Sequence, residues 1–169
     1  MILAFLIWLE NLTLFSSLRS SAYAYPVVLA LHLTAISLFG AMIVASDLRL
    51  LGWALSGSSI GDVLTPLRWP KRFGFLLAGT CGFLLFASKA EEYYYNPFFR
   101  AKALLFVLVA VHALAFRSSV YGNPAELDGA AQRPLAKLAA SLSLLLWLGI
   151  LCVGRGIGYV AGRPGMHYR

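Results

Sequence analysis

Charged residues are scarce in this chain, and cysteine and methionine are scarcer. Only 12% of its 169 residues are Asp, Glu, Lys or Arg, while 60% are hydrophobic and the mean hydropathy is +0.76. A soluble domain has about a quarter charged residues, so the composition excludes a disordered chain and a soluble enzyme domain. Two cysteines exclude a disulfide scaffold, and the presence of only three methionines, one of them the initiator, argues against a copper-handling protein. The composition predicts a small polytopic membrane protein.

The long apolar runs predict the fold, because a spanning helix needs about 20 mostly apolar residues. We expect an all-α protein: an N-terminal interfacial amphipathic helix over residues 1–20, a four-helix transmembrane bundle over 21–162, and a tail over 163–169. Asn96 and Pro97 read as a helix N-cap followed by proline at the first helical position. The four spans are expected at about residues 26–52, 72–95, 97–117 and 137–159.

The first 18 residues are apolar but interrupted by Glu10, Thr13 and Ser17, which share one helical face. A cleaved signal peptide is disfavoured, because no basic region precedes the apolar stretch. A fifth span would place Glu10 in mid-membrane, at a cost of about 2.5–3.5 kcal/mol or more. An amphipathic helix lying in the interface accommodates all of these residues and is the preferred interpretation.

The basic residues flank apolar segments and form no stripe along a solvated helix, so the net charge of +7 predicts lipid headgroups, not nucleic acid, as the partner. Fourteen Lys and Arg residues divide seven to seven between the two sides of the predicted bundle. The positive-inside rule therefore favours neither orientation of the bundle. Both termini are placed outside because the loops that join spans concentrate their charges beside the membrane.

A series of short motifs runs through most of the chain: Trp8-Leu9-Glu10, Tyr25-Pro26, His32, and Asp47-Leu48-Arg49-Leu50-Leu51-Gly52. This series resembles an uncharacterised family of bacterial four-helix inner-membrane proteins. The resemblance implies a multi-pass location in the cytoplasmic membrane and no particular activity. More distantly, a histidine early in the first span is similar to copper-resistance membrane proteins and to membrane b-type cytochromes.

His32 is the first candidate functional residue, because an ionisable side chain inside a span is rare and marks a functional site by default. One interpretation is a neutral imidazole that hydrogen-bonds a neighbouring helix. The others are a ligand of haem or copper, and a residue that handles protons or binds quinone.

His112 is the other histidine in a predicted span, and a histidine pair on two helices is a way to hold haem b. His32 lies about six residues, or roughly 9 Å, beyond Pro26, whereas His112 lies about 15 residues, or roughly 22 Å, beyond Pro97. The two histidines reach similar depths in the membrane only if residues 97–102 lie outside it. Helix tilt can then account for the remaining difference in depth. His32 and His112 are therefore the candidate metal ligands.

If successive spans are antiparallel, several polar residues lie on the same side of the bundle as His32. Lys102 and Arg155 are the candidates there to bind an anionic or quinone-like headgroup or haem propionates. The alternative is an aromatic belt with snorkelling basic residues. Arg155, between Gly154 and Gly156, is less free to snorkel.

Other features have plain structural interpretations. Asp47 and Arg49 are read as an ion pair at the end of the first span, with a gate on a solute path as the alternative. Small residues recur at Gly154, Gly158 and Gly162, and again at Ala78, Gly79 and Gly82, which favours close helix packing or self-association.

The function predicted is a membrane subunit or anchor of an electron-transfer assembly, not catalytic alone, that binds haem b or quinone and docks other membrane or periplasmic subunits. The alternatives are a small-solute or copper transporter and a non-catalytic scaffold subunit.

Overall fold

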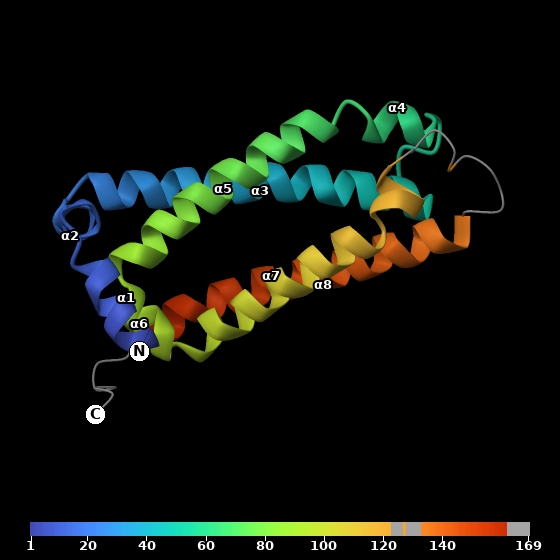
Figure 1. Cartoon of the computed structure of the whole chain (residues 1–169). Coiled ribbons are helices and arrows are strands. Elements are labelled where there is room, and N and C mark those ends of the chain that lie inside the picture. Colours follow the sequence, from blue (N-terminus) through green and yellow to red (C-terminus); the bar gives the residue numbers. More distant parts are fainter. Residues whose placement is uncertain (123–126, 128–132, 162–169) are drawn as a thin grey trace.

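The computed structural model describes residues 1–122, 127 and 133–161, and within them the chain is helical with no strand. Figure 1 shows the arrangement. The elements in chain order are α1 (Ile2–Glu10), α2 (Thr13–Ser20), α3 (Ala24–Leu51), α4 (Ile60–Leu64), α5 (Arg68–Ser88), α6 (Ala90–Tyr95), α7 (Pro97–Ala115), the π-helical turn η1 (Arg117–Tyr121) and α8 (Arg133–Ala161).

Three helices, α3, α7 and α8, are long and apolar enough to cross a membrane. The prediction of a membrane protein is supported by this finding. The predicted second span, residues 72–95, is divided between α5 and α6, because the helix breaks at Lys89 with φ −144° and ψ 44°. Arg68, Lys71 and Arg72 lower the hydropathy of the first turns of α5. That α5 is the fourth span stays a prediction.

The N-terminal segment differs from the single helix expected over residues 1–20. It consists of α1 and α2, bent by 63° relative to each other, and the pair together is apolar enough for a broken span or a re-entrant loop. The bend lies at Asn11 and Leu12, where the Ile7 carbonyl accepts from both the backbone N–H and the side-chain Nδ2 of Asn11, at 3.2 and 2.8 Å. In Figure 1 α1 lies across the end of the long helices where α3 begins.

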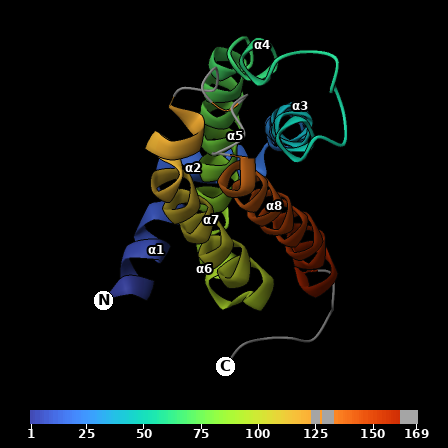
Figure 2. The same ribbon diagram turned by 90° about the vertical axis from the view of Figure 1, so that its right-hand side faces the viewer.

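The long helices pack in the order α5, α3, α8, α7. Figure 2 shows α3 nearly end-on, with α5 and α8 beside it and α7 beyond α8. Glycines permit the close approaches: a Cβ at Gly74 of α5 would lie 3.2 Å from Phe39 Cβ, and one at Gly149 of α8 would lie 3.4 Å from Leu105. Phe39 also meets Trp147 edge-on at 5.2 Å between ring centroids. These contacts are typical of helix packing in lipid, where small residues let backbones approach.

The helix ends follow the expected capping chemistry. Asn96 Oδ1 accepts from the backbone N–H groups of Phe98 and Phe99 at 3.0 and 3.2 Å, so the predicted N-cap of α7 is confirmed. Gly52 ends α3 with φ +77°, a left-handed conformation that glycine adopts without steric cost. Gly162 and the predicted tail over 163–169 lie outside the described residues.

The position of α5 can be tested by labelling with a membrane-impermeant maleimide after Cys81 and Cys152 are replaced by serine. Gly57→Cys, in the exposed loop before α4, and Tyr94→Cys, in α6, lie at opposite ends of α5. If α5 spans, the two cysteines react from opposite sides of the membrane. Labelling of both from one side would show that α5 does not cross. Leu145→Cys on α8, where the leucine is 65% exposed on an apolar face, should react from neither side.

Candidate functional site

His32 lies on α3 and faces α5. Its Nδ1 stands 2.9 Å from the Ala78 carbonyl oxygen, and because a carbonyl only accepts, Nδ1 carries the proton. A Cβ at Gly82 would lie 2.8 Å from His32 Cε1, so this glycine provides the space for the ring. The hydrogen bond expected under the structural interpretation is therefore present, and the Nε2 lone pair is left for another group.

Lys102 lies on α7 and is half-buried, with its Nζ 3.8 Å from where a Cβ at Gly154 of α8 would stand. Its ammonium lies over the Phe106 ring at 5.8 Å and close enough to His32 for its charge to act on the imidazole. Within the described part of the chain it forms no ion pair and no hydrogen bond. Among the predicted site residues, His32 and Lys102 are thus the two whose charges interact, although they lie on α3 and α7, which are not a closely packed pair of helices.

His112 and Arg155 lie elsewhere. His112 Nε2 donates to the Ala139 carbonyl of α8 at 2.9 Å, and its ring contacts Phe116 at a centroid distance of 4.9 Å. Arg155 is exposed, with its guanidinium over the Tyr159 ring at 5.0 Å. The structure therefore does not join Arg155 to the pair formed by His32 and Lys102.

The two histidines face different helices, His32 towards α5 and His112 towards α8. The structure does not bring their rings together as axial ligands of one haem. No group of three or more His, Cys, Asp or Glu side chains that could hold a metal ion occurs in residues 1–122, 127 and 133–161. Haem and copper binding stay predictions.

The end of the bundle near His32 is closed by the N-terminal helices. Arg19 of α2 forms an ion pair with Glu10 of α1 and donates to the Ser88 carbonyl at 3.2 Å. Glu10 Oε2 also accepts from the backbone N–H of Glu91 at 2.9 Å, across the break between α5 and α6. Glu10 is therefore held by protein partners at the start of α6.

Aromatic rings line the same end. Phe86 of α5 and Phe99 of α7 stack at 5.1 Å with an interplanar angle of 4°, and Tyr93 stacks on Phe99 at 5.0 Å. Burial and a hydrogen bond with Tyr25 raise the pKa of Tyr93 well above the ordinary tyrosine value, so its phenol stays neutral.

A second polar cluster, which the sequence did not predict, surrounds Asp47 near the other end of α3. Asp47 is only 2% exposed, and its carboxyl hydrogen-bonds the Ser143 hydroxyl of α8. Lys71 of α5 donates to Ser46 Oγ at 3.0 Å. Arg49, the expected ion-pair partner, instead donates to the Ser58 carbonyl at 2.9 and 2.6 Å. Asp47 therefore faces the protein, contrary to its interpretation as a helix-end anchor.

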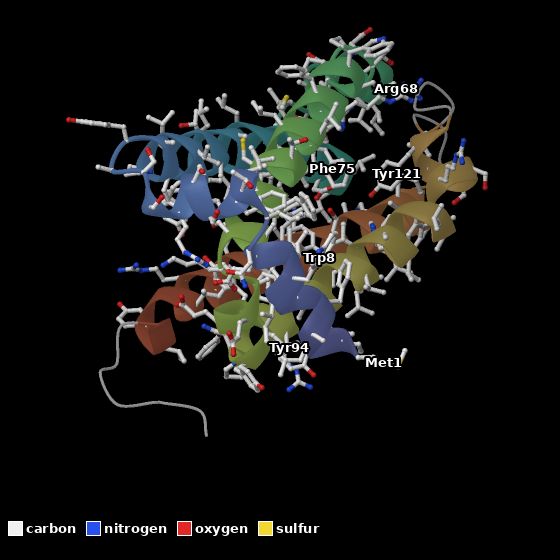
Figure 3. The ribbon with its side chains drawn as sticks, turned by 60° about the vertical axis from the view of Figure 1, so that its left-hand side comes forward. Met1, Trp8, Arg68, Phe75, Tyr94 and Tyr121 are labelled. Carbon is white, nitrogen blue, oxygen red and sulfur yellow. The ribbon has the colours of Figure 1, made fainter. Side chains whose placement is uncertain are left out.

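Arg68 and Tyr121 flank this second cluster. Arg68 Nη2 donates to the Tyr121 carbonyl at 2.8 Å, and Figure 3 shows the two residues near each other and away from Tyr94. Burial, and then the charge of Asp47, raise the pKa of the Tyr121 phenol above its ordinary value. The signal in the sequence for this cluster is weak: Ser143 is a polar residue in the apolar run of α8, but Ser141 is another, and nothing in the sequence distinguishes the two.

Comparison with known proteins gives one match. The profile of a family of unknown function, DUF6644, matches residues 8–160. The chain belongs to the DUF6644 family. The match begins two residues before Glu10 and includes α3, α5, α7 and both polar clusters. Membership of a family of unknown function agrees with the predicted resemblance to an uncharacterised family. No curated protein and no solved structure matches the chain.

The fit of His32 to α5 yields a mutational prediction. Gly82→Ala would place a methyl group 2.8 Å from His32 Cε1, so the ring must move and its hydrogen bond to Ala78 weakens. We expect a loss of about 1–3 kcal/mol in stability, measured as a lower melting temperature in detergent. Gly79→Ala is the matched control on the same helix, because no atom lies within 4 Å of its Cβ position. Equal melting temperatures for the two variants would contradict the close contact between His32 and Gly82.

Proposed function

We propose that the chain is an integral membrane subunit of an electron-transfer assembly, not catalytic alone, and that it binds a quinone headgroup beside His32 and Lys102. The observation that supports this function is the half-buried ammonium of Lys102, which has no carboxylate partner in the described residues and lies near an imidazole already fixed at Nδ1. A charge held inside a membrane bundle without a protein partner favours a ligand as its partner.

The two side chains supply complementary chemistry for such a headgroup. The Lys102 ammonium has only donors and suits a quinone carbonyl oxygen, and charge-assisted hydrogen bonds of this kind are the stronger ones. His32 Nε2 is an acceptor, because the proton of the neutral ring is held at Nδ1 by Ala78. His32 can therefore accept one of the two hydroxyl protons, and the other leaves to water, when the reduced headgroup gives its two electrons to a redox centre in a partner subunit.

Quinone is favoured over haem and copper by the arrangement of donors. A haem held by two histidines needs both rings on one iron, whereas His32 and His112 face different helices. A quinone headgroup needs a donor, an acceptor and apolar walls. Phe106, against which Lys102 lies, is an apolar residue at this place.

We propose further that the chain lies in the bacterial cytoplasmic membrane with both termini outside, so that the quinone would bind at the outer side. None of the α7 side chains is fully buried, and the Cβ positions of Gly79 and Gly158 have open space around them. These faces would contact lipid, other membrane or periplasmic subunits, or a second copy of the chain. In the labelling experiment on α5, Tyr94→Cys would then react from outside.

Binding of a short-chain ubiquinone analogue to the purified protein in lipid nanodiscs tests the proposal. Lys102→Met removes a charge-assisted hydrogen bond worth about 1.5–3 kcal/mol, so the dissociation constant should rise about tenfold or more. The matched control is Lys89→Met: this lysine lies at the same end, pairs with Glu92 at 3.7 Å and should not affect binding.

Two results would contradict the quinone site. One is unchanged affinity in the Lys102→Met protein, and the other is an equal loss in the Lys89→Met protein. A Soret band in the purified protein that disappears in His32→Ala would favour haem b in its place.

A further inference from the structure

The Asp47 cluster lies where four elements meet, away from the proposed quinone site. Asp47 is on α3, Lys71 on α5, Tyr121 on η1 and Ser143 on α8. Asp47 is 15 residues beyond His32 on the same helix, which corresponds to about 22 Å. The apolar side chains that pack this end, with Leu50, Val120 and Ala139 among them, are buried.

The two oxygens of the Asp47 carboxyl have different environments. One is in contact with the Ser143 hydroxyl, and the other, Oδ2, is buried with no hydrogen-bond partner among the described residues. An ionised carboxylate is acceptor-only and has about four lone-pair sites. A single hydroxyl leaves most of them unsatisfied, and a buried charge without a partner tends to neutralise.

Lys71 is the counter-charge that acts on Asp47, but its hydrogen bond goes to a different group. Its Nζ donates to Ser46 Oγ at 3.0 Å, while the Ser46 hydroxyl itself donates to the Met42 carbonyl at 2.8 Å. Lys71 is still close enough to Asp47 for the two charges to interact. The Lys71 ammonium is thus hydrogen-bonded to Ser46, the residue before Asp47, and not to the Asp47 carboxyl.

The other charged or titratable groups near Asp47 are already engaged. Arg68, also on α5, donates to the Tyr121 and Gly122 carbonyls. Tyr121 of η1 is a half-buried neutral phenol. From α8 the group that touches the carboxyl is the uncharged Ser143 hydroxyl. Lys71 is therefore the one counter-ion that the described residues offer.

We propose that Asp47 is a proton-binding site and that Lys71 is its movable counter-ion. In the arrangement of this structure the proton is on Oδ2, Ser143 binds the other oxygen and Lys71 is on Ser46. When the proton leaves to water at this end of the bundle, the carboxylate takes the Lys71 ammonium from Ser46. When a proton returns to Oδ2, the ammonium returns to Ser46. Lys71 keeps all its protons throughout, so the charge of the cluster changes by one.

Infrared spectroscopy of the full chain in lipid nanodiscs at neutral pH tests the site directly. The wild type should show the C=O stretch of a protonated carboxyl, and Asp47→Asn, which keeps the size of the side chain, should lose it completely. Asp62→Asn is the matched control, because Asp62 is an exposed carboxylate on α4 and its removal should leave the band intact.

Two further variants report on the neighbours and do not depend on the folding of the Asp47→Asn protein. Ser143→Ala should move the band to higher frequency, since the C=O group loses a hydrogen bond. Ser46→Ala should reduce the band, since Lys71 loses its alternative partner and pairs with Asp47. The proposal is overturned if the wild type has no such band, if Asp47→Asn retains it, or if neither Ser143→Ala nor Ser46→Ala changes it.

Discussion

A polar group inside an apolar helix must find a partner in the protein, because lipid offers none. This constraint determines how the long helices of this chain pack. His32 of α3 donates to α5, His112 of α7 donates to α8, and Ser143 of α8 binds Asp47 of α3. Each of these contacts joins a pair of helices that pack together in the order α5, α3, α8, α7. The polar residues therefore determine which helices are neighbours. Leucine and phenylalanine do not determine this, because they pack equally well against lipid.

Both polar clusters depend on α3, the central helix of this order. His32 lies near its beginning and Asp47 near its end, about 22 Å apart, which is much of the roughly 30 Å hydrocarbon thickness of a bilayer. The first cluster combines an imidazole with an ammonium, and the second combines a carboxyl with an ammonium. The proposed quinone site and the proposed proton site therefore lie towards opposite surfaces of the membrane.

The sequence was sufficient for the class of protein, three of the four expected spans, the Asn96 cap and the family resemblance, because each depends on local composition or a short motif. It was not sufficient for the bend between α1 and α2 or for the environment of Asp47. Asp47 and Arg49 are two residues apart and suggested one ion pair, yet successive helical positions point in different directions. Only the packing of α5 and α8 determines that Asp47 faces Ser143 while Arg49 contacts Ser58.

The order of the helices is tested most directly by disulfide cross-linking in membranes, after Cys81 and Cys152 are replaced by serine. Phe39→Cys with Gly74→Cys should cross-link α3 to α5, because a Cβ at Gly74 lies 3.2 Å from Phe39 Cβ. Leu105→Cys with Gly149→Cys should cross-link α7 to α8 less efficiently, because it is the end of the Leu105 side chain that lies 3.4 Å from the Cβ position of Gly149. Gly74→Cys with Leu105→Cys, which pairs α5 with α7, should not cross-link. Efficient oxidation of that last pair, with none in the first two, would contradict the account.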